Sequence, residues 1–533
     1  MHDEPSRAPG SILRRRTSRR AFLAGGAAIA AAGSAAAVVA VVEQSGPAGR
    51  SKAVAPPHGS STPPNAATAA ALAQPISDPK TRAAHLLRRA GFGGTAAEID
   101  EFSTLSRDDA ADRLLNFATV DNSALDARLS KITLTPGLPT LSQMTEWWLT
   151  RLAYTARPLE ERMTLIWHGL LTTELGKVGA KRSQLVLNQN NFYRQNALPR
   201  WDDFVKAAGR DPAMLYYLDN IENTEAHANE NYAREQMELF TLGVGNYTED
   251  DVRASARAYT GWRITQPDLP KPLPKGDPAA LRAAYAKAYA SFTPQFFISP
   301  RQHDDGMKTF LGKTGNFGGD DIVDIIMQTP AAAKHLCTRL FTEFANYNPS
   351  EATITNLVQV WQHNDHQVKP VVRAILTSDE FYSMASYRGM VRSPVDFIVG
   401  TIRGLQLDVA FGDGRLNSKS YEAMNQILFN PPSVAGWPGG STWISTGTFF
   451  ARINFLDQFF STRAGSALPI PALSNAATVA EMVSQATAAL TDGQLAPGSQ
   501  QAISTYAQTL PTHEEQAAAV AYLTLSSPEY QLI

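Results

Sequence analysis

Apolar residues recur at helical spacing along almost the whole chain after residue 80, and this periodicity limits the fold more than any other feature. The best strand candidate, residues 292–299, is short, and a final region from about 466 alternates Ala-rich helices with Pro and Gly turns. The sequence therefore predicts a mainly α fold: a single large helical domain with long loops and at most short strands. The main helical segments are 80–90, 95–105, 107–117, 141–156, 157–171, 184–198, 229–243, 248–261, 280–290, 320–329, 331–347, 350–363, 369–378, 393–405, 420–428 and 449–461.

The first 42 residues carry an export pattern. Ser18-Arg19-Arg20-Ala21-Phe22-Leu23 matches the twin-arginine signal and precedes an Ala/Gly/Val run that ends near Val42. That run is just long enough for a membrane anchor, which is the alternative interpretation. Residues 43–78 are rich in Ala, Pro and Ser without periodicity and predict a disordered linker before a helical domain at 79–533. We therefore expect an exported protein of the secreted or cell-envelope class, carried by the twin-arginine translocase.

Composition excludes several kinds of site. The formal net charge is −2, so nothing in the charge balance indicates nucleic-acid binding. Cys337 is the only cysteine, which excludes an intrachain disulfide and a thiolate metal cluster. The chain contains no Gly-x-Ser-x-Gly, no His-Glu-x-x-His and no dinucleotide fingerprint. The run 306–314 resembles a phosphate-binding loop but has one residue too many between its glycines, so we reject that interpretation.

The stretch from Asn229 to Gly243 gathers acid groups on one face of a predicted helix. Asn229 is a good N-cap and Gly243 a good C-terminal residue. At about 100° per residue, three carboxylates and one arginine share an arc opposite an apolar face. That face is either a ladder of i,i+4 ion pairs, or a source of oxygen ligands and acid–base groups one turn apart. The charged residues of this arc are Glu230, Arg234, Glu235 and Glu238.

Two histidines and one tryptophan lie in patterns that allow either structure or chemistry. His168 lies in an apolar helix, where it is a buried core residue or a single ligand or general base. His303 opens the polar turn His303-Asp-Asp-Gly306, which suits an Asx-type loop or a ligand loop. Lys308 follows it and could bind an anionic group. Trp437, in a Gly- and Pro-rich loop, is a packing lid or the wall of a carbohydrate-like or apolar site.

Several segments, taken in order, resemble the bacterial family called domain of unknown function 1800. The resemblance runs from about residue 80 to the C-terminus and implies a largely helical exported protein without an established activity. It also implies a possible partner, since such proteins are often encoded beside an exported sulfatase-like family, domain of unknown function 1501. Many relatives resemble one another in a His-Asn-His pattern, but here Gly169 and Leu170 follow His168, which rules out a two-histidine site on this helix. The segments that carry the resemblance are 86–93, 162–168, 211–219, 229–243, 256–262, 303–308 and 431–439.

Two hypotheses remain open. The first is an exported metal-dependent hydrolase built on a Glu/His/Asp cluster, with a divalent Ca, Mg, Mn or Fe ion as its cofactor. The second is a non-catalytic cell-envelope binding or scaffold protein whose motifs are buried ion-pair networks. For the hydrolase, the catalytic candidates are His168, Glu235, Glu238, His303 and Asp304, the cofactor- or substrate-binding candidates are Arg234, Lys308 and Trp437, and the metal-ligand candidates are Glu235, Glu238 and His303.

Overall fold

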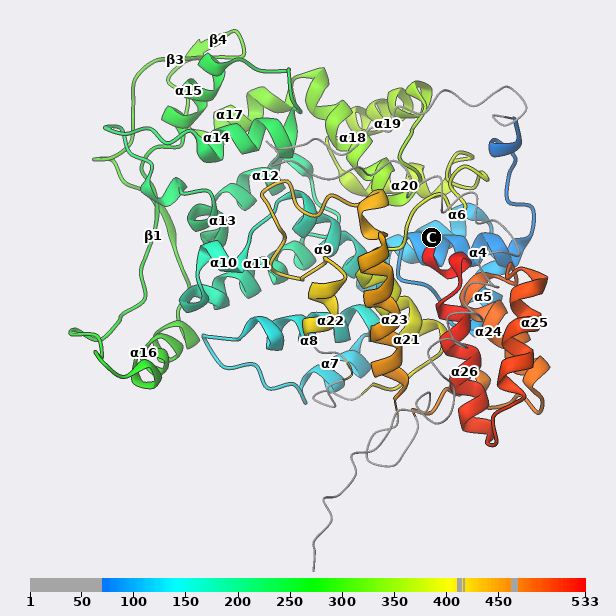
Figure 1. Cartoon of the computed structure of the whole chain (residues 1–533). Helices are drawn as coiled ribbons and strands as arrows, with labels where there is room; N and C mark the ends of the chain where they lie inside the picture. Colours follow the sequence, from blue (N-terminus) through cyan, green and yellow to red (C-terminus); the bar gives the residue numbers. More distant parts are fainter. Residues whose placement is uncertain (1–69, 410–414, 416–417, 462–467) are drawn as a thin grey trace, which may run out of the picture. The chain divides into compact units, whose positions relative to one another are not determined.

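The computed structural model describes residues 70–409, 415, 418–461 and 468–533 (Figure 1). Within these ranges it contains helices and two small antiparallel sheets, so the predicted mainly α fold is confirmed. The export pattern and residues 43–69 of the expected linker lie outside the described residues. Order begins before residue 79, because Ile76 is buried and its N–H donates to the Tyr382 carbonyl at 2.8 Å. No helix in the described ranges is both long enough and apolar enough to span a bilayer.

The helical region contains two compact units, each built from segments that are distant in sequence. Unit 1 comprises the described parts of 1–106, 382–426 and 439–533. Unit 2 comprises 107–381 and 427–438, and it holds every candidate site residue named above.

The described parts of unit 1 contain helices, joined by loops and two isolated β-bridges, and no named strand. Asp78 caps the first of these helices through the Thr81 N–H, and Pro79 stands at the first helical position, where its missing N–H costs nothing. Three C-terminal helices pack against one another (orange to red, Figure 1). The helices of unit 1 are α4 (Pro79–Arg89), α5 (Ala96–Ser103), α21 (Pro394–Gly404), α22 (Ser418–Ala423), η6 (Gly440–Trp443), α23 (Thr446–Phe460), η7 (Pro471–Leu473), α24 (Val479–Thr491), α25 (Pro497–Ala507), α26 (His513–Leu525) and η8 (Pro528–Gln531).

Unit 2 carries the remaining helices and both sheets. Its first half consists of α6 (Arg107–Leu115), η2 (Phe117–Thr119), α7 (Ser123–Leu129), α8 (Leu141–Tyr154), α9 (Pro158–Leu170), α10 (Leu175–Val178), η3 (Ala180–Arg182), α11 (Ser183–Gln195), α12 (Trp201–Gly209), α13 (Pro212–Tyr217) and η4 (Asn220–Glu222). Its second half consists of α14 (Asn231–Glu235), η5 (Gln236–Thr241), α15 (Glu249–Ala258), β1 (Trp262–Ile264), α16 (Pro278–Ala290), β2 (Phe296–Ile298), β3 (Lys308–Phe310), β4 (Lys313–Gly315), α17 (Gly319–Met327), α18 (Pro330–Phe344), α19 (Glu351–His363) and α20 (Val368–Thr377).

The two sheets each contain two short antiparallel strands. β2 falls inside the predicted strand segment 292–299 and pairs with β1, with Arg263 opposite Phe297. β3 and β4 form a hairpin that turns at Leu311 and Gly312, both with positive φ. The run 306–314 is therefore strand, turn and strand, whereas a phosphate-binding loop would lead from a strand into a helix.

The central stretch departs from the predicted continuous α-helix. α14 ends at Glu235, and η5 from Gln236 to Thr241 is a π-helix. The Thr241 hydroxyl donates to the Gln236 carbonyl five residues earlier at 2.6 Å, and the Gln236 side chain accepts a bond from Tyr259 at 2.6 Å. These contacts widen the turn and change the angular positions of the residues that follow. Gly243, with φ of 80°, follows the end of the helix as predicted.

Candidate functional site

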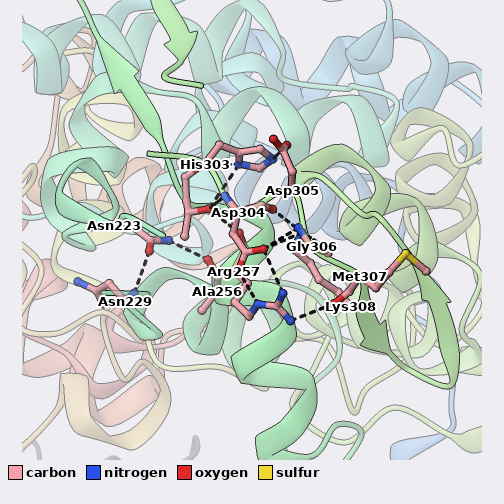
Figure 2. Close-up of polar contacts among 11 residues, drawn as sticks. Asn223, Asn229, Ala256, Arg257, His303, Asp304, Asp305, Gly306, Met307 and Lys308 are labelled. Atoms are coloured by element: carbon pink, nitrogen blue, oxygen red, sulfur yellow. Dashed lines mark hydrogen bonds and ion pairs between the residues drawn. The ribbon is translucent and has the colours of Figure 1, made fainter. Parts of the chain in front are cut away.

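The loop that begins at His303 is fastened to α15 by a bidentate ion pair. Arg257 Nε donates to Asp304 Oδ2 at 2.6 Å, and Nη2 donates to Oδ1 at 3.0 Å. Figure 2 shows the guanidinium directed at this carboxylate, while Nη1 donates to the Met307 carbonyl at 3.1 Å. Hydrogen bonding from Arg257 holds the pKa of Asp304 below its ordinary value. Asp304 is therefore an ionised anchor whose two oxygens are both occupied from within the chain.

Lys308 completes this network from a fully buried position. Its Nζ donates to the carbonyls of Asp304 at 2.6 Å and Gly306 at 3.0 Å, and lies 3.8 Å from Asp304 Oδ1. Burial lowers the pKa of Lys308, and the negative charge of Asp304 opposes that change. Because its ammonium group is enclosed and bonded to the loop, Lys308 is not presented to an external anion, contrary to its predicted role. At Gly306 a Cβ would stand 2.8 Å from Arg257 Nη2, so a larger residue there would push the guanidinium aside.

His303 is oriented by the backbone of the turn after α15. Its Nδ1 lies 2.8 Å from the Thr260 carbonyl, which can only accept, so Nδ1 carries the proton in the neutral ring. Its Nε2 faces the exposed Asp305 carboxylate at 3.8 Å (Figure 2). The backbone N–H of Asp304 donates to the Thr260 hydroxyl at 2.8 Å. Thr260, in the turn after α15, therefore holds both the His303 ring and the Asp304 backbone. Contacts within the chain fix the conformation of this loop.

Asn223 connects the start of the central stretch to α15. Its Nδ2 donates to the Ala256 carbonyl at 2.9 Å, and its Oδ1 accepts the Asn229 N–H at 2.8 Å (Figure 2). The Asn229 side chain in turn accepts the Asn231 N–H at 2.9 Å, but the helix begins at Asn231 and its N-cap is Glu230, so the predicted N-cap at Asn229 is one residue too early. Helix α14 is therefore held in place by a buried amide that sequence reasoning overlooked.

Only half of the predicted ladder of ion pairs on α14 forms. Arg234 donates to Glu230 at 2.9 Å and makes two bonds of 2.8 Å to Glu249. The predicted pair between Arg234 and Glu238 is wrong. The π-helix moves Glu238 to another angular position, and Glu238 accepts a bond from the Tyr247 hydroxyl at 2.8 Å instead. Arg234 therefore orients Glu230 and Glu249, at partly exposed positions where such pairs stabilise modestly.

Glu235 is the one acid of the stretch that keeps an available carboxylate. It is half-buried, and it makes no hydrogen bond or ion pair with the part of the chain that the structure describes. Burial raises the pKa of Glu235, and the nearby charge of Glu238 raises it further. A carboxylic acid with a raised pKa holds its proton to a higher pH than an ordinary carboxyl group, which suits a general acid.

The predicted metal-ligand set is not assembled. Within residues 70–409, 415, 418–461 and 468–533, no three His, Cys, Asp or Glu side chains are grouped so that they could hold a metal ion. Glu235, Glu238 and His303 therefore do not form the expected ligand triad. The Thr260 carbonyl engages His303 Nδ1 and the Tyr247 hydroxyl engages Glu238, so the chain itself orients these two side chains rather than a shared ion.

His168 lies apart from these contacts, in an aromatic enclosure. Its ring centroid is 5.3 Å from Trp148, 5.7 Å from Phe429 and 5.5 Å from Trp437. Burial lowers the pKa of His168 to about 3, so the ring is neutral at physiological pH. Trp437 packs against this histidine, which matches the predicted packing role for its loop. Among the described residues His168 Nε2 is buried without a hydrogen-bond partner, so no bond to that nitrogen orients the ring as a general base.

A buried triad of charges under the same enclosure escaped sequence reasoning. Glu161 is fully buried and bonds to Arg194 at 2.5 and 3.0 Å, to Arg151 at 2.9 Å and to the Trp148 indole at 3.0 Å. Burial alone would raise the pKa of Glu161, but the two guanidinium groups hold it below its ordinary value. The sequence did contain an indication of this buried acid, because Glu161 lies seven residues before His168 and so falls on the same buried face of α9.

Asp211 was also overlooked as a titrating group. Its Oδ1 accepts the N–H groups of Ala213 and Met214 at the start of α13, together with a bond from Gln189 Nε2 at 2.7 Å. Removal from water raises the pKa of Asp211 to about 7 despite these bonds. The sequence Asp-Pro is a helix-start signal, so its capping role was predictable, whereas its desolvation depends on the surrounding helices.

Comparison with known proteins gives a family and no activity. A family model described as protein of unknown function (DUF1800) matches residues 85–532. The matched range contains every candidate site residue. No curated protein and no solved structure matches the chain.

Proposed function

The chain belongs to the DUF1800 family, and from that premise we propose that it is a non-catalytic binding or scaffold protein of the cell envelope. The observation that carries this proposal is the network of Arg257, Asp304 and Lys308 (Figure 2). These residues come from two of the segments that carry the family resemblance. Their polar atoms are directed at one another, which is what a structural role for the motifs requires.

The wider arrangement of charges supports the same role. Glu161 with its two arginines, and Asn223 between α14 and α15, are likewise satisfied by partners inside unit 2. Polar networks of this kind fix one packing arrangement among several that apolar contacts alone would allow. A rigid exported surface with fixed loops suits binding. As its partner we propose an exported sulfatase-like protein of the domain of unknown function 1501 family, with the twin-arginine translocase acting during export.

A second candidate function rests on Glu235. Its half-buried carboxylate, with its raised pKa and no bond among the described residues, favours a hydrolase in which Glu235 acts as general acid or base beside Glu238. The π-helix that begins directly after it adds support, because such local widenings are frequent at functional sites.

A double-mutant cycle on Arg257 and Asp304 tests the structural role. Asp304→Asn leaves Lys308 buried without its counter-charge, so we expect a loss of about 2–3 kcal/mol in the free energy of unfolding. The coupling between Arg257→Met and Asp304→Asn should be about 1–2 kcal/mol, measured by urea unfolding. Asp305→Asn is the matched control, since the neighbouring Asp305 side chain is 81% exposed and should cost less than about 0.5 kcal/mol. Equal, small losses for both variants would remove the basis of the proposal.

A further inference from the structure

Two stretches of unit 2 that contain no Asp or Glu pack together. They are residues 175–201 and 278–303, and they meet where α16 (lower left in Figure 1) contacts η3. Asp277, just before the second stretch, caps α16 by accepting the Ala279 and Ala280 N–H groups. The whole chain has a formal net charge of −2, so the positive charge of these stretches is concentrated locally.

Tyrosine rings hold two of the cations in this region. The Arg182 guanidinium carbon lies 3.9 Å from the centroid of the Tyr216 ring, and Lys181 Nζ lies 5.8 Å from the centroid of the Tyr285 ring. Arg182 Nη1 also donates to the Val178 carbonyl at 3.1 Å. A tyrosine ring attracts a cation to its electron-rich face and leaves the charge in place. These contacts therefore orient the two side chains without neutralising them.

Helix α16 adds a third cation on the same side. Arg282 is exposed and precedes Tyr285 by three residues, and Tyr289 follows Tyr285 by four, so the three share one side of the helix. Burial raises the pKa of Tyr289, whereas the charge and hydrogen bonding of Arg182 oppose the rise. Arg182 therefore lies beside the side of α16 that carries Arg282.

The three cations have no carboxylate partner among the described residues. Lys181, Arg182 and Arg282 form no ion pair there, whereas Lys177, four residues before Lys181, is paired with Asp219 at 2.8 Å. Unpaired cations that lie close together repel one another, so a negatively charged partner lowers the electrostatic free energy of this region. We call the basic surface the set Lys181, Arg182, Arg282, Tyr216, Tyr285 and Tyr289.

The composition of the basic surface indicates a protein partner. Tyrosine and arginine are enriched at the energetically important centres of protein–protein interfaces. A guanidinium binds a carboxylate through two parallel hydrogen bonds, and carboxylates are the acidic groups of Asp and Glu. A polysaccharide site would instead present open aromatic faces to stack on sugar rings, whereas Arg182 covers one face of Tyr216.

We propose that the basic surface binds an acidic surface of a partner protein, whose Asp and Glu side chains pair with Lys181, Arg182 and Arg282. The proposal rests on the binding role inferred above, and it identifies where on unit 2 that role is carried out and which chemistry the partner presents. Oppositely charged surfaces bind less tightly as the salt concentration rises, so the complex should weaken with added salt.

Binding of fluorescently labelled poly-L-glutamate to the full-length protein tests the basic surface, with the dissociation constant measured by fluorescence anisotropy. The affinity of the wild type should fall between about 50 and about 200 mM salt, where screening limits charge interactions to about 10 Å. Arg282→Glu should raise the dissociation constant about tenfold or more. Lys287→Glu makes the same change of charge on an exposed residue about 200° around α16 from Tyr285, and should raise it less than about threefold.

Three results would overturn the proposal: no binding at the lower salt concentration, equal weakening in the two variants, or binding of dextran sulfate with none of poly-L-glutamate. The last result would assign the basic surface to an anionic polysaccharide. The urea midpoint of Arg282→Glu should match that of the wild type, and Lys181→Glu on η3 replaces it if it does not fold. The cycle on Arg257 and Asp304 measures stability, so its failure is distinguishable from failure of the basic surface.

Discussion

Replacing Glu161 by glutamine is expected to lower the free energy of unfolding by about 3–5 kcal/mol. Glu161 is fully buried and is the shared partner of Arg151 and Arg194, so the variant leaves two guanidinium groups without the carboxylate that bonds to both of them. The Trp148 indole also loses a charged acceptor, which removes a stronger hydrogen bond than a neutral amide can provide. Urea unfolding followed by circular dichroism measures the loss.

Glu160→Gln is the matched control for this prediction. Glu160 lies next to Glu161, and burial, followed by the charge of Glu161, raises the pKa of Glu160. Neutralising it should therefore change stability by less than about 1 kcal/mol. If Glu161→Gln proves as stable as Glu160→Gln, the buried triad does not hold α8, α9 and α11 together.

Acidification is expected to destabilise the protein through His168. Its folded pKa of about 3 lies below the unfolded value of about 6.5, so the unfolded chain takes up the proton first. The stabilisation is complete above pH 6.5 and is lost as the pH falls towards 3, by about 3–5 kcal/mol in total. His168→Phe, which keeps an aromatic ring in the enclosure and cannot be protonated, should flatten this part of the pH profile. The measurement is the urea midpoint at several pH values.

Two other histidines must be considered when that measurement is interpreted. Burial lowers the pKa of His335 to about 4, so the wild-type slope contains a second contribution that His168→Phe leaves in place. His363 is exposed at the end of α19, and His363→Phe is the control for replacing a histidine by phenylalanine outside the aromatic enclosure. A slope in His168→Phe equal to that of the wild type would mean that the aromatic enclosure admits a protonated ring.

Helical periodicity predicted the fold because the helices are amphipathic and most of them begin at recognisable caps. The π-helix could not be predicted from the same pattern. It depends on the Gln236 side chain meeting Tyr259, a contact that arises only when α15 packs beside it. The prediction assumed an unbroken α-helix and therefore placed Glu238 on the same face as Arg234. Because the π-helix changes the angular position of Glu238, the predicted ion pair between the two residues was wrong.

The candidate site shows the same limit. The segments 256–262 and 303–308 were both singled out in the sequence, but nothing in either of them indicates that Arg257 and Asp304 form a bidentate pair across 47 positions. The sequence also could not show that the Lys308 side chain is fully buried, because its spacing equally suits an exposed turn. The sequence thus identified the residues that belong to the candidate site, whereas the bonding partner and the burial of each side chain became known only from the tertiary structure.

The most direct test of the central claim, that the motif residues are structural and form no metal site, is the effect of divalent metal on the urea midpoint. Millimolar Mn²⁺ or Ca²⁺ is added to the metal-free protein, to Glu235→Gln and to His303→Ala. The wild-type midpoint is expected not to change with either ion. A metal site would instead stabilise the wild type by about 2.7 kcal/mol at a hundredfold excess over its dissociation constant. A rise of that size, absent from both variants, would contradict the account.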